Sequence, residues 1–227
     1  MLSIALDGPV GAGKTTIARE LAKRLNFLYV DTGALYRSIG KYVLDQGKDP
    51  SVPDDVIPCL KQISLKLSYN ELNQQRVYLN GVDVSDEIRT PEVSMAASQV
   101  ASIPEVREFL LFLQREIARK NHVVMDGRDI GTTILPNASF KVFLTASAEE
   151  RAARRHKELA AKGNTSTFEE VLEDLKKRDF DDSHRAASPL AQAPDAVLVD
   201  TTGLSLDEAI DKLEELTQEA IFNREGR

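Results

Sequence analysis

The sequence predicts an α/β fold of three layers, in which a five-stranded parallel sheet carries helices on both faces. Two observations support this prediction. Five short apolar segments alternate along the chain with stretches whose apolar residues recur at helical spacing, and strands that are buried on both faces read as such apolar runs. The length of 227 residues also suffices to bury one good core, which fits a single α/β domain with insertions.

The strands of this sheet are expected where apolar runs are bounded by turn residues. Their ranges are Leu2–Leu6, Phe27–Val30, Val123–Met125, Phe140–Leu144 and Ala196–Val199. The first strand leads through a glycine-rich turn into a helix over Lys14–Leu25, because the apolar residues there repeat every three to four positions. A second helix follows the second strand, from about Ala34 to Gln46.

The remaining helices are indicated by spacing and by residues suited to their ends. Asp54 or Asp55 is expected to cap a short helix, and Thr167 and Ser205 fit as caps of the last two helices. The other expected ranges are Pro91–Ser102, Pro104–Lys120, Ala148–Ala161 and Phe168–Arg178.

One segment departs from the α/β pattern. Leu65, Leu67 and Tyr69 alternate with polar residues, and a second alternating stretch runs into the pair Asn80-Gly81. Alternation with an Asn-Gly turn is typical of antiparallel strands. The sequence therefore predicts a small β insert at about residues 63–85, inside the α/β frame.

The glycine-rich turn after the first strand carries the clearest chemical signal. Gly8, Gly13, Lys14 and Thr15 fit the phosphate-loop pattern G-x-x-x-x-G-K-[ST]. Such a loop points backbone N–H groups into one concavity, at the positive end of the following helix. The lysine can reach the β- and γ-phosphates, and the hydroxyl can ligate Mg²⁺. The residues expected to hold the phosphate chain are Gly8, Pro9, Val10, Gly11, Ala12, Gly13, Lys14, Thr15 and Thr16.

Two further segments follow predicted strands, so their side chains are expected at the same edge of the sheet. In Asp31–Arg37, Thr32 and Arg37 could hold a second phosphate; the alternative is a capped helix with a surface arginine. In Met125–Gly131, Asp126 stands where a carboxylate would orient Mg²⁺ or its waters. Arg128 beside carboxylates indicates either an anion site or a local ion pair.

A basic helical hairpin is inserted between the fourth and fifth strands. It carries Arg151, Arg154 and Arg155 on one side and the segment Lys177–Arg185 on the other. Such a hairpin can act as a lid that brings guanidinium groups onto a transferring phosphoryl group and excludes water. The alternative is a solvated charged hairpin.

Composition limits the remaining possibilities. A net charge of −7 argues against a broad nucleic-acid-binding surface. The single Cys59 allows no intrachain disulfide, and the three histidines lack metal-ligand spacing. The sequence shows no apolar run of membrane-spanning length and no signal peptide. We therefore expect a soluble cytoplasmic protein without membrane partners, and the lack of an obvious external apolar stripe favours a monomer.

Over nearly its whole length, the sequence resembles the bacterial cytidylate kinases, a branch of the nucleoside monophosphate kinases. The matching stretches, in order, are Leu6–Pro9 with the phosphate loop, Asp31–Arg37, Glu87–Arg89, Ala97–Ala101, Pro104–Arg107, Asp126–Thr132 and Arg178–Arg185. The β insert resembles the enlarged monophosphate-binding region that separates this branch from adenylate kinase.

The resemblance implies transfer of the γ-phosphate of MgATP to CMP or dCMP, with ATP and Mg²⁺ as the required ligands. It implies a P-loop kinase fold that forms a single domain over residues 1–227. Within it, residues 1–33, 121–147 and 186–227 would form the core, residues 34–120 the CMP-binding region, and residues 148–185 a helical lid.

The resemblance also implies roles for single residues. Thr32, Arg37, Arg128 and Arg185 would hold the CMP phosphate. Ser98, Arg107 and Asp129 would face the cytosine, and Arg178 and Asp182 the sugar. Thr15 and, through water, Asp126 would hold Mg²⁺. The residues expected to act on the transferring group are Lys14, Arg128, Arg154, Arg178 and Arg185.

The sequence departs from some of these relatives at two positions. Asp181 and Ser183 stand where some relatives carry additional arginines, which leaves Arg154 and Arg155 as the other lid guanidiniums.

Two other kinds of function compete with this interpretation. The first is a kinase for UMP, AMP or shikimate on the same frame. The β insert and the region of Ser98 and Arg107 argue against AMP and shikimate. UMP shares its size and ring with CMP, so it stays open as a secondary substrate. The second is a nucleotide-dependent switch, which would need a guanine-reading N-K-x-D motif that the sequence lacks.

Overall fold

The computed structural model describes residues 1–71, 74–161 and 163–225. Its central sheet contains five parallel strands in the order β2-β6-β1-β7-β8. These strands are β1 (Ser3–Asp7), β2 (Leu28–Asp31), β6 (Val123–Gly127), β7 (Phe140–Thr145) and β8 (Val197–Asp200). Each predicted strand is confirmed to within one or two residues.

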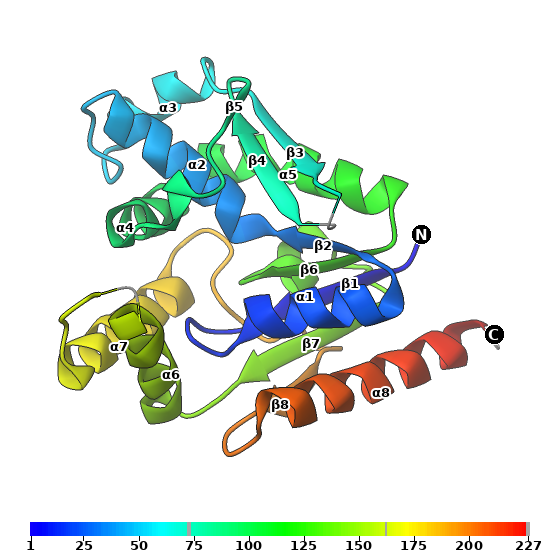
Figure 1. Cartoon of the computed structure of the whole chain (residues 1–227). Coiled ribbons are helices and arrows are strands. Elements are labelled where there is room, and N and C mark those ends of the chain that lie inside the picture. Colours follow the sequence, from blue (N-terminus) through cyan, green and yellow to red (C-terminus); the bar gives the residue numbers. More distant parts are fainter. Residues whose placement is uncertain (72–73, 162, 226–227) are drawn as a thin grey trace.

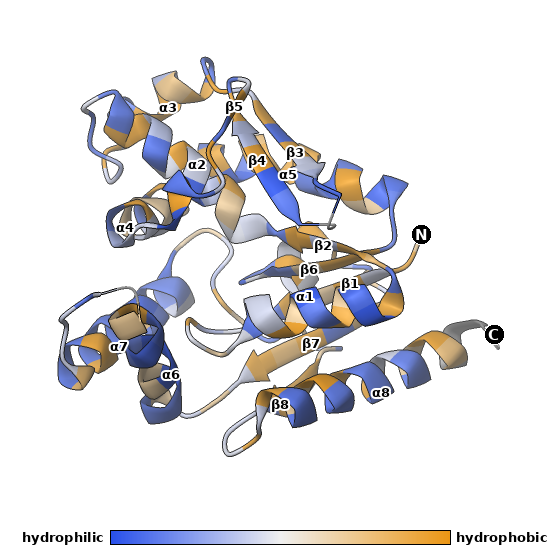
Figure 2. Cartoon of the chain, viewed as in Figure 1, coloured by the Kyte–Doolittle hydropathy of each residue, from blue (hydrophilic) through white to orange (hydrophobic). Residues whose placement is uncertain are grey.

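Helices cover both faces of this sheet, as Figure 1 shows. On one face lie α1 (Lys14–Leu25) and α8 (Leu206–Glu225), whose apolar residues pack with Ile4 and Leu6 of β1. On the other face, α5 (Pro104–Lys120) and the helical turn Ile130–Ile134 pack with Ala5 of the same strand. The side chains of one strand thus alternate between two cores, and the strands are mostly apolar in Figure 2.

A separate unit lies beside the β2 edge of the sheet and has an apolar core of its own. It contains α2 (Thr32–Asp45), α3 (Pro53–Leu60), β3 (Leu65–Tyr69), β4 (Gln75–Leu79), β5 (Val82–Asp83) and α4 (Pro91–Val100). The three strands form an antiparallel sheet, which confirms the predicted β insert. Asn80 and Gly81 both have positive φ, 51° and 86°, as a tight turn of this kind requires.

The basic hairpin consists of α6 (Ala148–Ala161) and α7 (Phe168–His184), which pack through Ala152, Val171 and Leu175. Thr167 caps α7, as predicted, and it also forms a reciprocal capping box with Glu170. The assignment of this hairpin as a lid, and the division of the chain into core, CMP-binding region and lid, stay predictions.

Two helix ends differ from the predictions. Helix α7 continues to His184 rather than ending at Arg178, and the Ser183 hydroxyl donates to the Asp179 carbonyl within the extension. Helix α3 begins at Pro53, so Asp54 and Asp55 lie in its first turn and do not cap it. Acidic residues there still favour the helix, because its amino end is positive.

The prediction for the last helix is confirmed at its start. Ser205 accepts from the Glu208 N–H at 3.3 Å, and the Glu208 carboxylate accepts from the Ser205 N–H at 2.8 Å. Cys59 is buried, as expected of a small core residue. None of the described helices is both long and apolar enough to cross a membrane.

The approach of β7 to the phosphate loop permits only glycine at position 8. A Cβ atom on Gly8 would lie 2.0 Å from the Leu144 carbonyl oxygen, and the φ of Gly8 is +150°. We expect Gly8→Ala to lower the free energy of unfolding by about 3 kcal/mol or more, since the backbone of β7 must move. Urea denaturation followed by circular dichroism measures this loss.

Gly47→Ala is the matched control, because Gly47 has φ +68° but nothing within 4 Å of an added Cβ. Its cost should be limited to backbone strain, about 1–2 kcal/mol. Equal losses in the two variants would contradict the steric argument.

Candidate active site

A cleft of about 440 Å³ opens at the carboxyl ends of β1, β2 and β6. Its walls come from segments far apart in the sequence: the loop 10–16, residues 31–37, helix α4, and the helices α6 and α7. Helices α4 and α6–α7 lie on opposite sides of the strand ends in Figure 1. The carboxyl edge of a parallel sheet is where such folds bind ligands.

The phosphate loop forms one end of this cleft. Lys14 is buried and its Nζ donates to the Pro9 carbonyl at 2.6 Å. Burial, and then the charge of Arg128, lower the pKa of the Lys14 ammonium. The loop residues that line the cleft are Val10, Gly11, Gly13, Lys14, Thr15 and Thr16. Gly8, Pro9 and Ala12 are not among the lining residues, and their predicted contact with the phosphate chain stays a prediction.

Asp126, at the end of β6, lies against the first turn of α1. The Thr15 hydroxyl donates to its Oδ2 at 3.0 Å, and the Tyr29 hydroxyl to its Oδ1 at 3.1 Å. Burial, and then the charge of Asp31, raise the pKa of Asp126 to about 6. A hydroxyl and a carboxylate side by side at a phosphate loop fit Mg²⁺, which prefers oxygen ligands and takes the rest from phosphates and water.

Among residues 1–71, 74–161 and 163–225, no group of three or more His, Cys, Asp or Glu side chains could hold a metal ion.

The start of α2 brings Thr32 and Arg37 to the cleft. The Thr32 hydroxyl donates to the Asp126 carbonyl at 2.7 Å. Asp31 caps α2 by accepting from the Ala34 N–H at 3.0 Å, and its other oxygen accepts from Arg37 Nη2 at 2.7 Å. Burial alone would raise the pKa of Asp31, but Arg37 holds it below its usual value. Arg37 Nε is buried without a hydrogen-bond partner in the described structure, so this N–H can donate to a bound anion.

Five charged residues form a chain of alternating sign along the opposite wall. Arg128 Nε donates to Asp182 at 2.8 Å, and Arg185 lies 3.6 Å from both Asp182 and Asp129. Arg107 completes the chain through a hydrogen bond to Asp129. Burial alone would raise the pKa of Asp182. The charges of Arg128 and Arg185 outweigh burial and hold this pKa below its usual value. Three guanidiniums share two carboxylates, so the chain keeps one positive charge.

The other predicted residues also line the cleft. Ser98 does so from α4, and Arg178 from α7, where its Nε lies 3.1 Å from Asp174. Arg154 donates to the Thr201 carbonyl at 3.1 Å, just after β8. Asp181 and Ser183 are exposed and are not among the lining residues. The structure thus brings the predicted CMP-binding residues together, and their roles stay predictions.

Comparison with known proteins adds an independent observation to this geometry. The family model described as "Cytidylate kinase" matches residues 4–219.

The chain belongs to the cytidylate kinase family.

Curated relatives agree. It is 48% identical over 215 residues to the cytidylate kinase of Carboxydothermus hydrogenoformans, which covers 95% of this chain and 96% of that protein. It is 49% identical over 214 residues to the cytidylate kinase of Caldanaerobacter subterraneus subsp. tengcongensis, with coverage of 94% and 93%. Membership of this kinase family makes the chain a phosphotransferase and implies ATP as the phosphate donor.

The fold is also found among solved structures. An uncharacterised protein from Eubacterium ventriosum superposes with a TM-score of 0.54 at 13% identity, covering 96% of this chain and 99% of that one. This likeness concerns the fold alone.

Sequence reasoning missed several residues of this cytidylate kinase cleft. Tyr36, Arg89 and Glu158 line it as well, beside Arg155, which was a lid candidate. Arg107 lies over the Tyr36 ring at 5.6 Å from its centre. Helical spacing was the available signal for Tyr36, because it lies one turn after Thr32.

Asp7 was also missed, although it precedes the phosphate loop directly. Its carboxylate accepts from the N–H groups of Ile130 and Gly131, both at 2.7 Å. It thereby ties the loop end of β1 to the segment after Asp129, a link that no local sequence signal reveals.

The burial of Asp7 predicts that the stability of the folded protein depends on pH. Burial raises its pKa from 3.8 to about 6, although the two backbone donors lower it. The folded protein therefore binds this proton more tightly than the unfolded chain does, so stability is lost as the pH rises from about 4 to about 6. We expect the stability of the wild type relative to Asp7→Asn to rise by up to about 3 kcal/mol as the pH falls from about 7 to about 4.

Urea denaturation of both proteins across this pH range measures the difference. Parallel stability curves for the two proteins would contradict a raised pKa at Asp7.

Proposed function

We propose that the protein is a cytidylate kinase that transfers the γ-phosphate of MgATP to CMP or dCMP, giving ADP and CDP or dCDP. One observation carries this proposal beyond membership of the family. A phosphate loop and a second group of anion-binding side chains, centred on Arg37 and Arg128, line the same cleft. A kinase for a phosphorylated acceptor needs two such sites next to each other.

The acceptor phosphate would lie among Thr32, Arg37, Arg128 and Arg185. A phosphate monoester is mostly dianionic near neutral pH, and one of its oxygens attacks the γ-phosphorus in line while ADP leaves. No protein nucleophile is needed. The cleft residues position two anions that repel each other and neutralise charge that spreads over the transferring group.

The base would be read by Ser98, Arg107 and Asp129. An aspartate can accept from the N4 amino group of cytosine, and an arginine can donate to the acceptors of the ring. Because Asp129 and Arg107 are already fixed by each other, a base with another pattern would leave buried groups unpaired, which costs affinity. Arg178 and Asp182 would approach the sugar.

The donor would be held by the phosphate loop, with Lys14 and Arg154 near the γ-phosphate. Mg²⁺ would be held by Thr15 directly and by Asp126 through water, and when bound it would neutralise phosphate charge. We further propose a monomeric, cytoplasmic enzyme without nucleic-acid partners, which fits the net charge of −7.

The proposed reaction predicts a definite order of acceptors. In a coupled assay of ADP production with MgATP, CMP and dCMP should turn over strongly, UMP weakly, and AMP and GMP not at all. Lys14→Met should fold normally and lose at least about 100-fold in rate, because it removes charge from the transition state.

Lys41→Met is the matched control, since Lys41 pairs with Asp45 and Glu87 outside the cleft. No turnover with any monophosphate, from folded wild-type protein that still binds ATP, would refute the proposal.

Base reading is tested separately by Arg107→Met. This variant should lower kcat/KM for CMP by about 100-fold and bring CMP and UMP closer together, while KM for MgATP changes less than twofold. Steady-state kinetics with both acceptors measure these ratios. Arg115→Met is the control on the same helix, because Arg115 donates to the carbonyls of Thr133 and Ile134 and does not line the cleft. An equal loss for every monophosphate would argue against base reading.

A further inference from the structure

Two side chains connect the β insert by hydrogen bonds to the edge strand of the main sheet. Strand β2 has only one neighbour in its sheet, β6, so one edge of its backbone must find other partners. Tyr69 and Gln75 are directly opposite each other at the end of the β3–β4 hairpin. The Tyr69 hydroxyl donates to the Tyr29 carbonyl at 3.0 Å.

Gln75 makes a paired contact with Asp31, the last residue of β2. Its Oε1 accepts from the Asp31 N–H at 2.9 Å, and its Nε2 donates to the Asp31 carbonyl at 3.3 Å. One side-chain amide thus bonds both backbone groups of one residue. This is what the peptide groups of a neighbouring strand would otherwise do.

The backbone that Gln75 holds belongs to a residue of the cleft. The carboxylate of Asp31 is buried, caps α2 and binds Arg37. The insert therefore fixes the main chain of Asp31, and the side chain of Asp31 fixes a guanidinium with a buried Nε that has no hydrogen-bond partner in the described structure. Gln75 is thus joined to Asp31 by two hydrogen bonds, and Asp31 to Arg37 by one.

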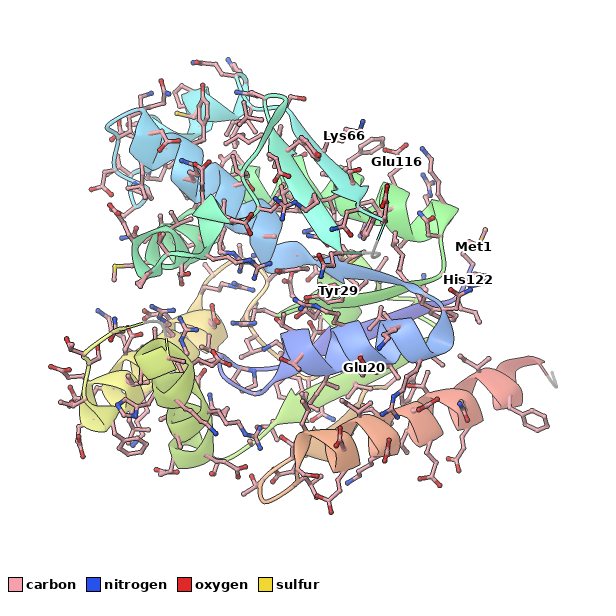
Figure 3. All side chains as sticks on the ribbon, in the orientation of Figure 1. Met1, Glu20, Tyr29, Lys66, Glu116 and His122 are labelled. Carbon is pink, nitrogen blue, oxygen red and sulfur yellow. The ribbon has the colours of Figure 1, made fainter. Side chains whose placement is uncertain are left out.

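The hydrogen-bonded attachment of the insert to β2 is flanked by open space. A second cavity, of about 260 Å³, lies beside it and is lined by Arg19, Tyr29, Asp31, Gln75 and Arg89, among others. Figure 3 labels Tyr29, which lies on β2 beneath the insert. Leu67 of β3 packs against the apolar core of the central sheet, and the hydrogen bonds of Gln75 and Tyr69, which are directional, fix how the insert meets β2.

We propose that Gln75 is a positioning residue for the phosphoryl acceptor, which couples the β insert to the acceptor phosphate through Asp31 and Arg37. The proposal rests on the proposed function in assigning Arg37 to the CMP phosphate. Gln75 itself does not line the active-site cleft, so it acts only through these two residues.

Gln75→Met tests the coupling, because methionine has a similar length and no amide. We expect KM for CMP to rise about five- to tenfold, as for the loss of hydrogen bonds that orient a charged group, while KM for MgATP changes less than twofold. Gln62→Met is the control in the same unit, since the Gln62 side chain accepts only from the Tyr42 hydroxyl among the described side-chain hydrogen bonds.

The same substitution in an Arg37→Met background completes a double-mutant cycle. If Gln75 acts through Arg37, it should then have almost no further effect on KM for CMP. Additive effects, equal increases for both substrates, or a lowered Tm with unchanged KM values would each overturn the proposal.

Hydrogen exchange supplies a readout that does not depend on activity. In Gln75→Met, the Asp31 amide should exchange at least tenfold faster by NMR than in the wild type or in Gln62→Met. Unchanged exchange would overturn the proposal even if the wild type phosphorylates CMP. If the Asp31 amide exchanges faster in Gln75→Met but the wild type does not phosphorylate CMP, the proposed function is refuted. The link between Gln75 and Asp31 is then retained.

Tyr69→Phe is a second variant in case Gln75→Met does not fold. It removes only the hydroxyl bond to Tyr29 and should weaken CMP use in the same direction.

Discussion

Mutual neutralisation of arginines and aspartates is the interaction on which the cleft depends. These residues are Arg128 and Asp129 from the segment after β6, Arg107 from α5, Asp182 from α7, and Arg185 directly after α7. Alone, three half-buried guanidiniums would repel one another and would each be costly to take out of water. The two carboxylates between them make the burial tolerable, fix the direction of each side chain and leave a positive excess for an anion.

A second point of convergence is Asp126. Its position follows from the strand order, because β6 lies between β2 and β1 and its end meets both. The Thr15, Tyr29 and Thr32 hydroxyls all donate to this residue, two to its carboxylate and one to its backbone. The phosphate loop and the start of α2 are therefore held at a distance that the sheet itself sets.

Much of this arrangement could be predicted from local sequence. The strands are short apolar runs, the phosphate loop has fixed glycines, and Thr32, Arg37 and Asp126 follow strands that end at the same edge. Asp7 and Gln75 could not be predicted, because their importance comes from backbone groups that are far away in the sequence. The end of α7 was misplaced because a run of Asp and Ser favours a turn when read alone. In the helix, the Ser183 hydroxyl instead donates to the Asp179 carbonyl one turn earlier.

The separate apolar core of the insert unit also bears on how the chain reaches this structure. Strand β1 pairs with β6, Ser3 opposite Val123, so residues 32–122 must be spanned before the central sheet can close. Closing a long flexible loop costs entropy, and such non-local pairing slows folding. A segment that collapses on its own core brings its two ends together first. The unit that we propose to bind the acceptor would then also serve as the scaffold on which the central sheet assembles.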